Sequence, residues 1–203
     1  MMKKYLAMAL LFLCSYYAFG QKKLVKDIDF DGVKDTVYID AKTSEIVWRL
    51  STTKFKKIKS KGIETSTEDA RIEATKNGFE FHSNWMRAGY ANQFRYNKAL
   101  KKVQLIGMSR YEFGNAANDG SGESSVNLLT GDYIGNWNYF DHLANNEKGE
   151  LVKIPSIKTK MFFKQTFLED FNDVTYYNYS DRCSKLYEKA KAKTKKLRTN
   201  VKS

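Results

Sequence analysis

Four aspartates lie within nine residues early in the chain, between Asp27 and Asp35. The first three alternate with other residues, a glycine follows the third, and Asp35 is the fourth. Carboxylates held this close repel one another unless a cation neutralises them. Hard oxygen ligands at alternate positions, with a glycine that permits a sharp turn, are what Ca²⁺ coordination requires. The spacing therefore predicts a calcium loop whose ligands are Asp27, Asp29, Asp31, the Val33 carbonyl and Asp35.

The same segment has a simpler interpretation, in which the aspartate side chains accept hydrogen bonds from backbone amides of a solvated turn. An EF-hand is not expected, because Tyr38 stands where its bidentate glutamate would be and the following residues alternate like a strand. A calcium ion here would stiffen a turn in an extracellular domain, and it would not by itself identify a function.

The segment from Asp27 to Asp40 resembles the calcium loops of FG-GAP and VCBS-type repeats, in which an Asp-rich turn leads directly into a β-strand. It departs from their pattern at Phe30, where glycine is usual, and at Thr36, where an aliphatic residue usually opens the strand. The resemblance implies one bound Ca²⁺. It does not imply a propeller, because those families build propellers from many copies and this chain carries one.

Residues suited to catalysis are sparse. His82 lies in an alternating segment that predicts a strand, and nothing near His142 in the sequence completes a triad or a zinc site. Cys183 falls on the apolar face of a predicted helix and is expected to be a buried thiol. The carboxylates considered for glycoside cleavage are Glu112, Glu123, Asp132 and Asp141. Spacing places no two of them across a cleft, so the sequence leaves enzymatic activity uncertain and favours its absence.

Two short segments are dense in aromatic residues, and one of them also carries an arginine. These are the residue types enriched at binding hot spots. The alternative is that they pack in the core and at strand edges. The predicted binding surface consists of Trp85, Arg87, Tyr90, Trp137 and Tyr139.

The first twenty residues have the three parts of a secretory signal, with lysines at positions 3 and 4, an apolar run from Leu6 to Leu13 and a small-residue end at Gly20. The pattern predicts export to the periplasm or the cell surface. The apolar run is shorter than the roughly 20 residues of a transmembrane helix, and no transmembrane segment is expected later in the chain. Cleavage after Gly20 would leave Cys183 as the only cysteine, so no intramolecular disulfide is expected.

The formal net charge of +12 is concentrated at the C-terminal end. Lys185 to Ser203 carries eight Lys or Arg residues against Glu188 alone. We expect either a solvated helix end that frays beyond Lys191 or weak contact with acidic components of the cell envelope. No aromatic residue beyond Tyr187 is available to stack on bases, so nucleic acid is not expected as the main partner.

Alternation of apolar and polar residues dominates from Leu24 to Phe163 and predicts a mainly β fold, an antiparallel meander packed as a sandwich or open barrel with a short C-terminal helical segment. The clearest hairpin turns at Asn77-Gly78, a pair that accepts the positive φ angles of a tight turn. The polar stretch from Gly114 to Ser125 is expected to be a mobile loop. The predicted division is a signal peptide at 1–20, a single β-rich domain at 21–184 and a basic helix or tail at 185–203.

The overall layout, rich in Lys and Asn, resembles that of uncharacterised small secreted proteins of Bacteroidetes-type bacteria, a resemblance that implies no activity. The leading hypothesis is an exported, non-enzymatic binding protein of the cell envelope with an unknown protein or glycan ligand. Two alternatives stay open: an envelope hydrolase acting on glycan or peptidoglycan, and an immunity or inhibitor protein for a secreted effector.

Overall fold

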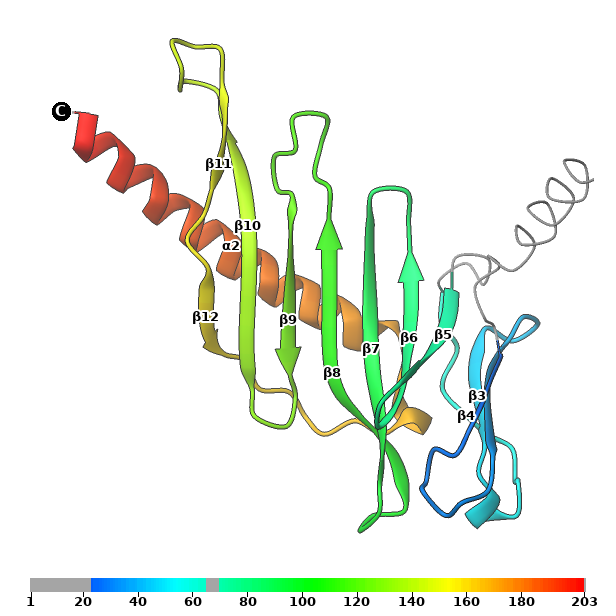
Figure 1. Ribbon diagram of the computed structural model, residues 1–203. Helices are drawn as coiled ribbons and strands as arrows, with labels where there is room; N and C mark the ends of the chain where they lie inside the picture. The colour runs from blue at the N-terminus through cyan, green and yellow to red at the C-terminus, as the bar shows by residue number, and fades with distance from the viewer. Residues whose placement is uncertain (1–22, 65–69, 203) are drawn as a thin grey trace, which may run out of the picture.

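The computed structural model describes residues 23–64 and 70–202, which form two antiparallel β-sheets and one long helix (Figure 1). The predicted signal peptide lies outside these residues. The mainly β prediction is confirmed, and both sheets are open rather than closed into a barrel. The small sheet has the strand order β1-β2-β3-β4. Its strands are β1 (Lys23–Lys26), β2 (Asp35–Asp40), β3 (Glu45–Arg49) and β4 (Ile58–Lys59).

The large sheet is a meander in the order β11-β10-β9-β8-β7-β6-β5, with β12 paired to β10. Successive strands are neighbours because short turns join them, which makes every pairing antiparallel. Its strands are β5 (Ala70–Thr75), β6 (Gly78–Asn84), β7 (Ala88–Asn97), β8 (Lys102–Glu112), β9 (Gly122–Asn127), β10 (Asp132–Asp141), β11 (Glu150–Lys153) and β12 (Ile157–Lys160).

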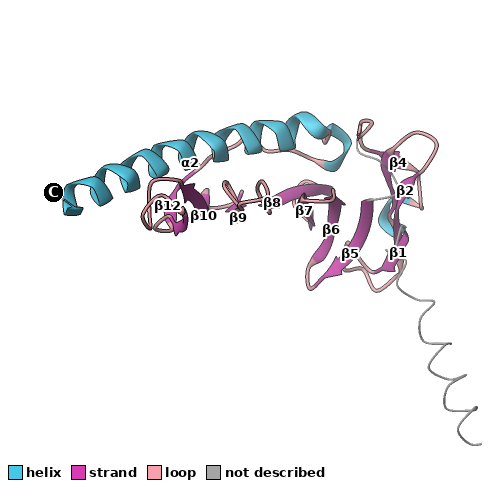
Figure 2. Ribbon diagram, turned by 90° about the horizontal axis from the view of Figure 1, so that it is seen from above, coloured by secondary structure: helices cyan, strands magenta, loops and turns pink. Residues whose placement is uncertain are grey.

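A single long helix, α2 (Asp173–Lys202), lies along one face of the large sheet (Figure 2). The predicted C-terminal helical segment is confirmed, but with 30 residues it is longer than expected, and it continues through the lysines to Lys202 instead of ending near Lys191. Two short 3₁₀ turns, η2 (Ser51–Thr53) and η3 (Leu168–Asp170), complete the described elements. Among the described residues, no helix is both long enough and apolar enough to cross a membrane.

The core joins both sheets and the helix. Alternation along β6 and β7 turns Phe79, Phe81 and Phe94 inward, and each of these rings is at most 1% exposed. The same apolar cluster contains Trp48 of the small sheet and Cys183 of α2, which confirms the expectation of a buried thiol. Burial of each large apolar side chain contributes roughly 1.5–3 kcal/mol, so this shared cluster holds the two sheets together.

The hairpin of β5 and β6 forms as predicted, but its turn differs from the expected one. Thr75 pairs with Gly78, and neither Asn77 nor Gly78 has a positive φ. A Cβ at Gly78 would collide with the carbonyl oxygen of Phe94 in β7. Glycine is therefore required here for the close approach of the neighbouring strand rather than for the turn itself.

The stretch from Gly114 to Ser125 is more ordered than expected. Its last residues belong to β9, and Ser124 is buried with its hydroxyl 2.9 Å from that of Tyr179 on α2. Before β9, the Arg87 side chain donates to the carbonyl oxygens of Gly114 and Asn115 at 2.9 and 3.1 Å. The prediction of a loop therefore holds for residues 114–121 and is wrong for residues 122–125, which belong to β9.

Candidate metal centre

The aspartate loop connects β1 to β2, and Asp35, the first residue of β2, fixes its closing end. Asp35 is fully buried, and its carboxylate accepts three backbone hydrogen bonds. Oδ2 accepts from the amides of Ile28 at 2.7 Å and Asp29 at 3.2 Å, and Oδ1 accepts from Ser51 at 2.8 Å. A buried carboxylate is tolerated when backbone donors surround it in this way. Asp35 therefore joins the loop to the start of η2.

Asp27 organises the middle of the loop. Its Oδ1 accepts from the amides of Phe30 at 2.7 Å and Asp31 at 3.2 Å, and its Oδ2 accepts from Gly32 at 3.0 Å. These bonds curl the backbone, so that Phe30 has φ of 63° and Gly32 has φ of 89°. Phe30 thus adopts a left-handed conformation that glycine reaches without steric cost. The position at which the sequence departs from the repeat pattern is one where glycine would suit the backbone.

Asp29 is the loop aspartate whose hydrogen bonds leave one buried carboxylate oxygen unpaired. It is 4% exposed, and the Thr52 hydroxyl donates to Oδ2 at 2.5 Å. Its Oδ1 is buried and has no hydrogen-bond partner among the described residues. Burial raises the pKa of Asp29, the charges of Asp35 and Asp31 raise it further, and the Thr52 bond opposes them. A cation beside Oδ1 would remove this penalty.

Three of the five predicted ligands converge. Carboxylate oxygens of Asp27, Asp29 and Asp35 all lie within 4.8 Å of one another, and this group could hold a metal ion. Asp27 Oδ2 and Asp35 Oδ1 each accept a single amide and so retain one lone pair, whereas the other oxygen of each carboxylate already accepts two amides. The donor set is all oxygen, which suits a hard cation.

The other two predicted ligands lie at the exposed edge of the loop. Asp31 accepts from the Ser51 hydroxyl at 2.5 Å and from the Val33 amide at 2.8 Å, and these bonds lower its pKa. Val33 is 48% exposed. The ligand roles of Asp31 and of the Val33 carbonyl stay predictions.

The predicted aromatic binding surface does not exist as one patch. Tyr90, Trp137 and Tyr139 are at most 3% exposed and belong to the core, because they lie on the inward face of β7 and β10. Trp85 is 44% exposed, although its ring packs 5.5 Å from that of Tyr90. Arg87 is exposed but bonds to backbone carbonyls. Three of the five residues therefore stabilise the fold rather than line a surface.

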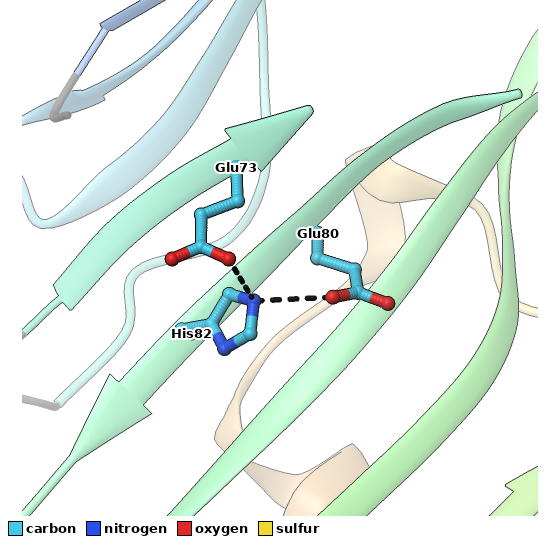
Figure 3. A group of neighbouring side chains, drawn as sticks. All are labelled: Glu73, Glu80 and His82. Atoms are coloured by element: carbon cyan, nitrogen blue, oxygen red, sulfur yellow. Dashed lines mark hydrogen bonds and ion pairs between the residues drawn. The ribbon is translucent and has the colours of Figure 1, made fainter. Parts of the chain in front are cut away.

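A second cluster of ionisable side chains, which the sequence did not suggest, lies on the β5–β6 hairpin (Figure 3). The His82 Nε2 atom is 3.3 Å from Glu73 and 3.1 Å from Glu80. Glu73 and Glu80 are direct partners across the hairpin, and His82 is two residues beyond Glu80 on the same face. The expected turn at Asn77-Gly78 would have paired Glu73 with His82, whereas the observed pairing of Thr75 with Gly78 sets Glu73 opposite Glu80.

The ionisable side chains of this cluster form hydrogen bonds and ion pairs with one another and with Arg71. Arg71 Nη2 lies 3.4 Å from His82 Nδ1, and arginine only donates, so Nδ1 accepts and the neutral ring carries its proton on Nε2, toward the two glutamates. Burial lowers the pKa of His82, the Arg71 charge lowers it further, and the two glutamates oppose both effects. A metal-bound histidine instead donates its second N–H to an acceptor. The arrangement fits a hydrogen-bonded network better than a metal site.

The face of the large sheet opposite α2 carries no described helix (Figure 2). Two adjoining hollows of about 280 and 270 Å³ share Ser109 and Ser125 in their lining. Gln93 and Asn127 border the first hollow, and Asn136 borders the second. Ile106 and Leu129 also line the first hollow and Ile134 the second, so the lining mixes polar and apolar side chains around the two central serines.

Comparison with known proteins identifies no relative: the chain matches no known protein family, no curated protein and no solved structure.

Proposed function

We propose that this chain is an exported binding protein of the cell envelope without enzymatic activity, and that the loop from Asp27 to Asp35 binds one Ca²⁺ that stabilises it. The buried, unpartnered Oδ1 of Asp29, beside oxygens of Asp27 and Asp35, carries the calcium part of the proposal. Export follows from the predicted signal peptide.

Calcium suits this loop better than magnesium. Ca²⁺ accepts six to eight oxygen ligands at about 2.3–2.6 Å in flexible geometry, whereas Mg²⁺ demands a near-ideal octahedron and keeps several waters. Here the carboxylates are already held by amides, so they can close on an ion only by small adjustments. A larger, geometrically tolerant cation fits such a loop.

Two observations favour binding over catalysis. The open face of the large sheet carries two hollows whose linings mix serine and amide side chains with Ile106, Leu129 and Ile134, a combination suited to holding a ligand. Two of the carboxylates considered for glycoside cleavage are engaged by basic side chains, since Lys160 lies 2.7 Å from Asp132 and Arg110 contacts Glu112. The bond from Lys160 lowers the pKa of Asp132, which makes this carboxyl a poor general acid.

Calcium-dependent thermal unfolding tests the metal site. The chain from residue 21 onward contains every described residue, and we expect millimolar Ca²⁺ to raise its midpoint relative to EDTA. An ion present at 100 times its dissociation constant adds about 2.7 kcal/mol to the free energy of unfolding. Asp29→Asn should abolish this gain, whereas Asp181→Asn, an exposed control on α2, should keep it. An equal gain in both variants, or none in the unaltered chain, would contradict the proposal.

Activity against peptidoglycan tests the absence of catalysis. We expect the purified chain to release neither sugars nor peptides from isolated sacculi. Release that disappears on Glu112→Gln or Asp141→Asn would instead establish a hydrolase.

A further inference from the structure

The solvent face of α2 carries a regular row of lysines. Lys185, Lys189, Lys193 and Lys196 are spaced four, four and three residues apart and are exposed. At 3.6 residues per turn they fall within an arc of about 80° and extend over roughly 16 Å of the helix axis. In Figure 2, no described element covers the side of α2 that faces away from the large sheet. We call these four residues the lysine stripe.

Three other basic side chains of α2 form hydrogen bonds or ion pairs within the protein. Arg182 donates to the Phe162 carbonyl at 2.6 Å, Lys191 lies 3.7 Å from Asp119, and Arg198 bonds to Glu150 at 3.2 Å. The described residues provide no hydrogen bond or ion pair to the lysine stripe. Its four charges are therefore held in place by the helix and remain available to a partner.

One exposed apolar side chain of α2 flanks the stripe. Leu197 is 56% exposed and falls about 40° beyond Lys193 around the helix. A row of cations bordered by an exposed Leu is typical of helices that lie on membrane surfaces, where the charges attract headgroups and the apolar group enters the interface.

We propose that the lysine stripe docks this protein on a membrane surface containing anionic phospholipid. Lysines attract diffuse negative charge as point charges, without the bidentate geometry by which arginine selects individual phosphates. No aromatic side chain of the stripe is available to stack on bases, since Tyr187 is half-buried against Trp137. The stripe lies within one arc of the helix surface, so its four charges can face a planar partner together. The inference does not depend on the calcium loop.

Vesicle co-sedimentation in EDTA tests the inference with the chain from residue 21 onward. We expect binding to vesicles of mixed phosphatidylglycerol and phosphatidylcholine, little binding to pure phosphatidylcholine, and weaker binding as salt shortens the Debye length below about 10 Å. Changing the four stripe lysines to Gln should reduce the vesicle partition at least about tenfold at low salt. Changing them to Arg should preserve it.

The matched control removes the same charge elsewhere, by changing Lys42, Lys54, Lys56 and Lys101 to Gln, all of which are exposed and far from α2 in sequence. We expect this variant to bind within about threefold of the unaltered chain. An equal loss in both Gln variants would show that net charge alone matters and would overturn the proposal. So would absence of binding to anionic vesicles, or tighter binding to duplex DNA than to vesicles at the same salt. Far-UV circular dichroism verifies that the stripe variants keep α2.

Discussion

Asp29 shows how one buried oxygen can point to a ligand. The carboxylates of its neighbours Asp27 and Asp35 accept hydrogen bonds from backbone amides, and these bonds hold the loop in its shape. Asp29 accepts only from Thr52 and leaves Oδ1 buried and unpaired, a cost of roughly 1–3 kcal/mol for a polar group in a protein interior. The solvated-turn interpretation accounts for Asp27 and Asp35, whereas a cation also accounts for Asp29.

The backbone at Phe30 gives a prediction about strain in this loop. Because Phe30 has φ of 63°, the free energy of unfolding should be about 1 kcal/mol higher for Phe30→Gly than for Phe30→Ala. Both variants lose the contact of the ring with Lys98 at 5.5 Å, so the comparison isolates the backbone. Chemical denaturation measures the difference. The same pair of changes at exposed Lys34, which has no positive φ, should show the opposite order, and a like order at both sites would refute the argument from strain.

At the residue scale, the sequence predicted the loop but not the surface. The ligand spacing was sufficient to predict that the carboxylates of Asp27, Asp29 and Asp35 lie close together, because all three belong to one short loop. Tyr90 and Trp137 could not be placed, because alternation shows that a strand has two faces but not which face a distant helix covers. Here α2 covers the face that carries both rings.

At the element scale, the sequence predicted the β5–β6 hairpin but not its register. Its two-residue turn pairs Thr75 with Gly78 and therefore sets Glu73 opposite Glu80 and Arg71 opposite His82. The length of α2 was also underestimated. Its last turns are rich in Lys and Ala, which are strong helix formers, and ion pairs such as Arg198 with Glu150 hold them to β11.

The hairpin network predicts how stability depends on pH. The folded pKa of His82 is lowered below its usual value near 6.5, by burial and by Arg71, so the folded state takes up a proton less readily than the unfolded state. His82 therefore contributes stability above about pH 6.5 that is lost as the pH falls toward its folded pKa. Arg71, Glu73 and Glu80 are the charged groups that face it.

The measurement is urea unfolding of the unaltered chain and of His82→Gln between about pH 7.5 and 5. The difference in free energy of unfolding should shrink steadily as the pH falls. His142→Gln is the matched control, because His142 is the only other histidine in the sequence. A difference that stays constant, or one that appears equally in the control, would contradict the assignment to His82.

At the scale of the whole molecule, the two sheets share one core and several polar ties. The apolar cluster includes Val37 and Trp48 from the small sheet and Phe94 from the large one. The Lys26 ammonium of β1 donates to the Thr75 carbonyl of β5, and the Lys61 amide, two residues after β4, donates at 3.1 Å to the carbonyl of Phe171, in the segment that leads into α2. Opening the small sheet alone would expose this shared apolar surface to water, so the chain should unfold as one unit.

Hydrogen exchange measures that coupling directly. Amides of β3 and of β7 should have opening free energies that agree within about 1 kcal/mol, because both require the shared core to open. If the loop binds calcium, EDTA should lower both by the same amount, since a ligand of the native state stabilises everything that unfolds with its site. Selective loss of protection in β3 would show that the small sheet opens by itself. The ion would then stabilise only the loop and its own sheet, and the membrane-docking helix would be independent of it.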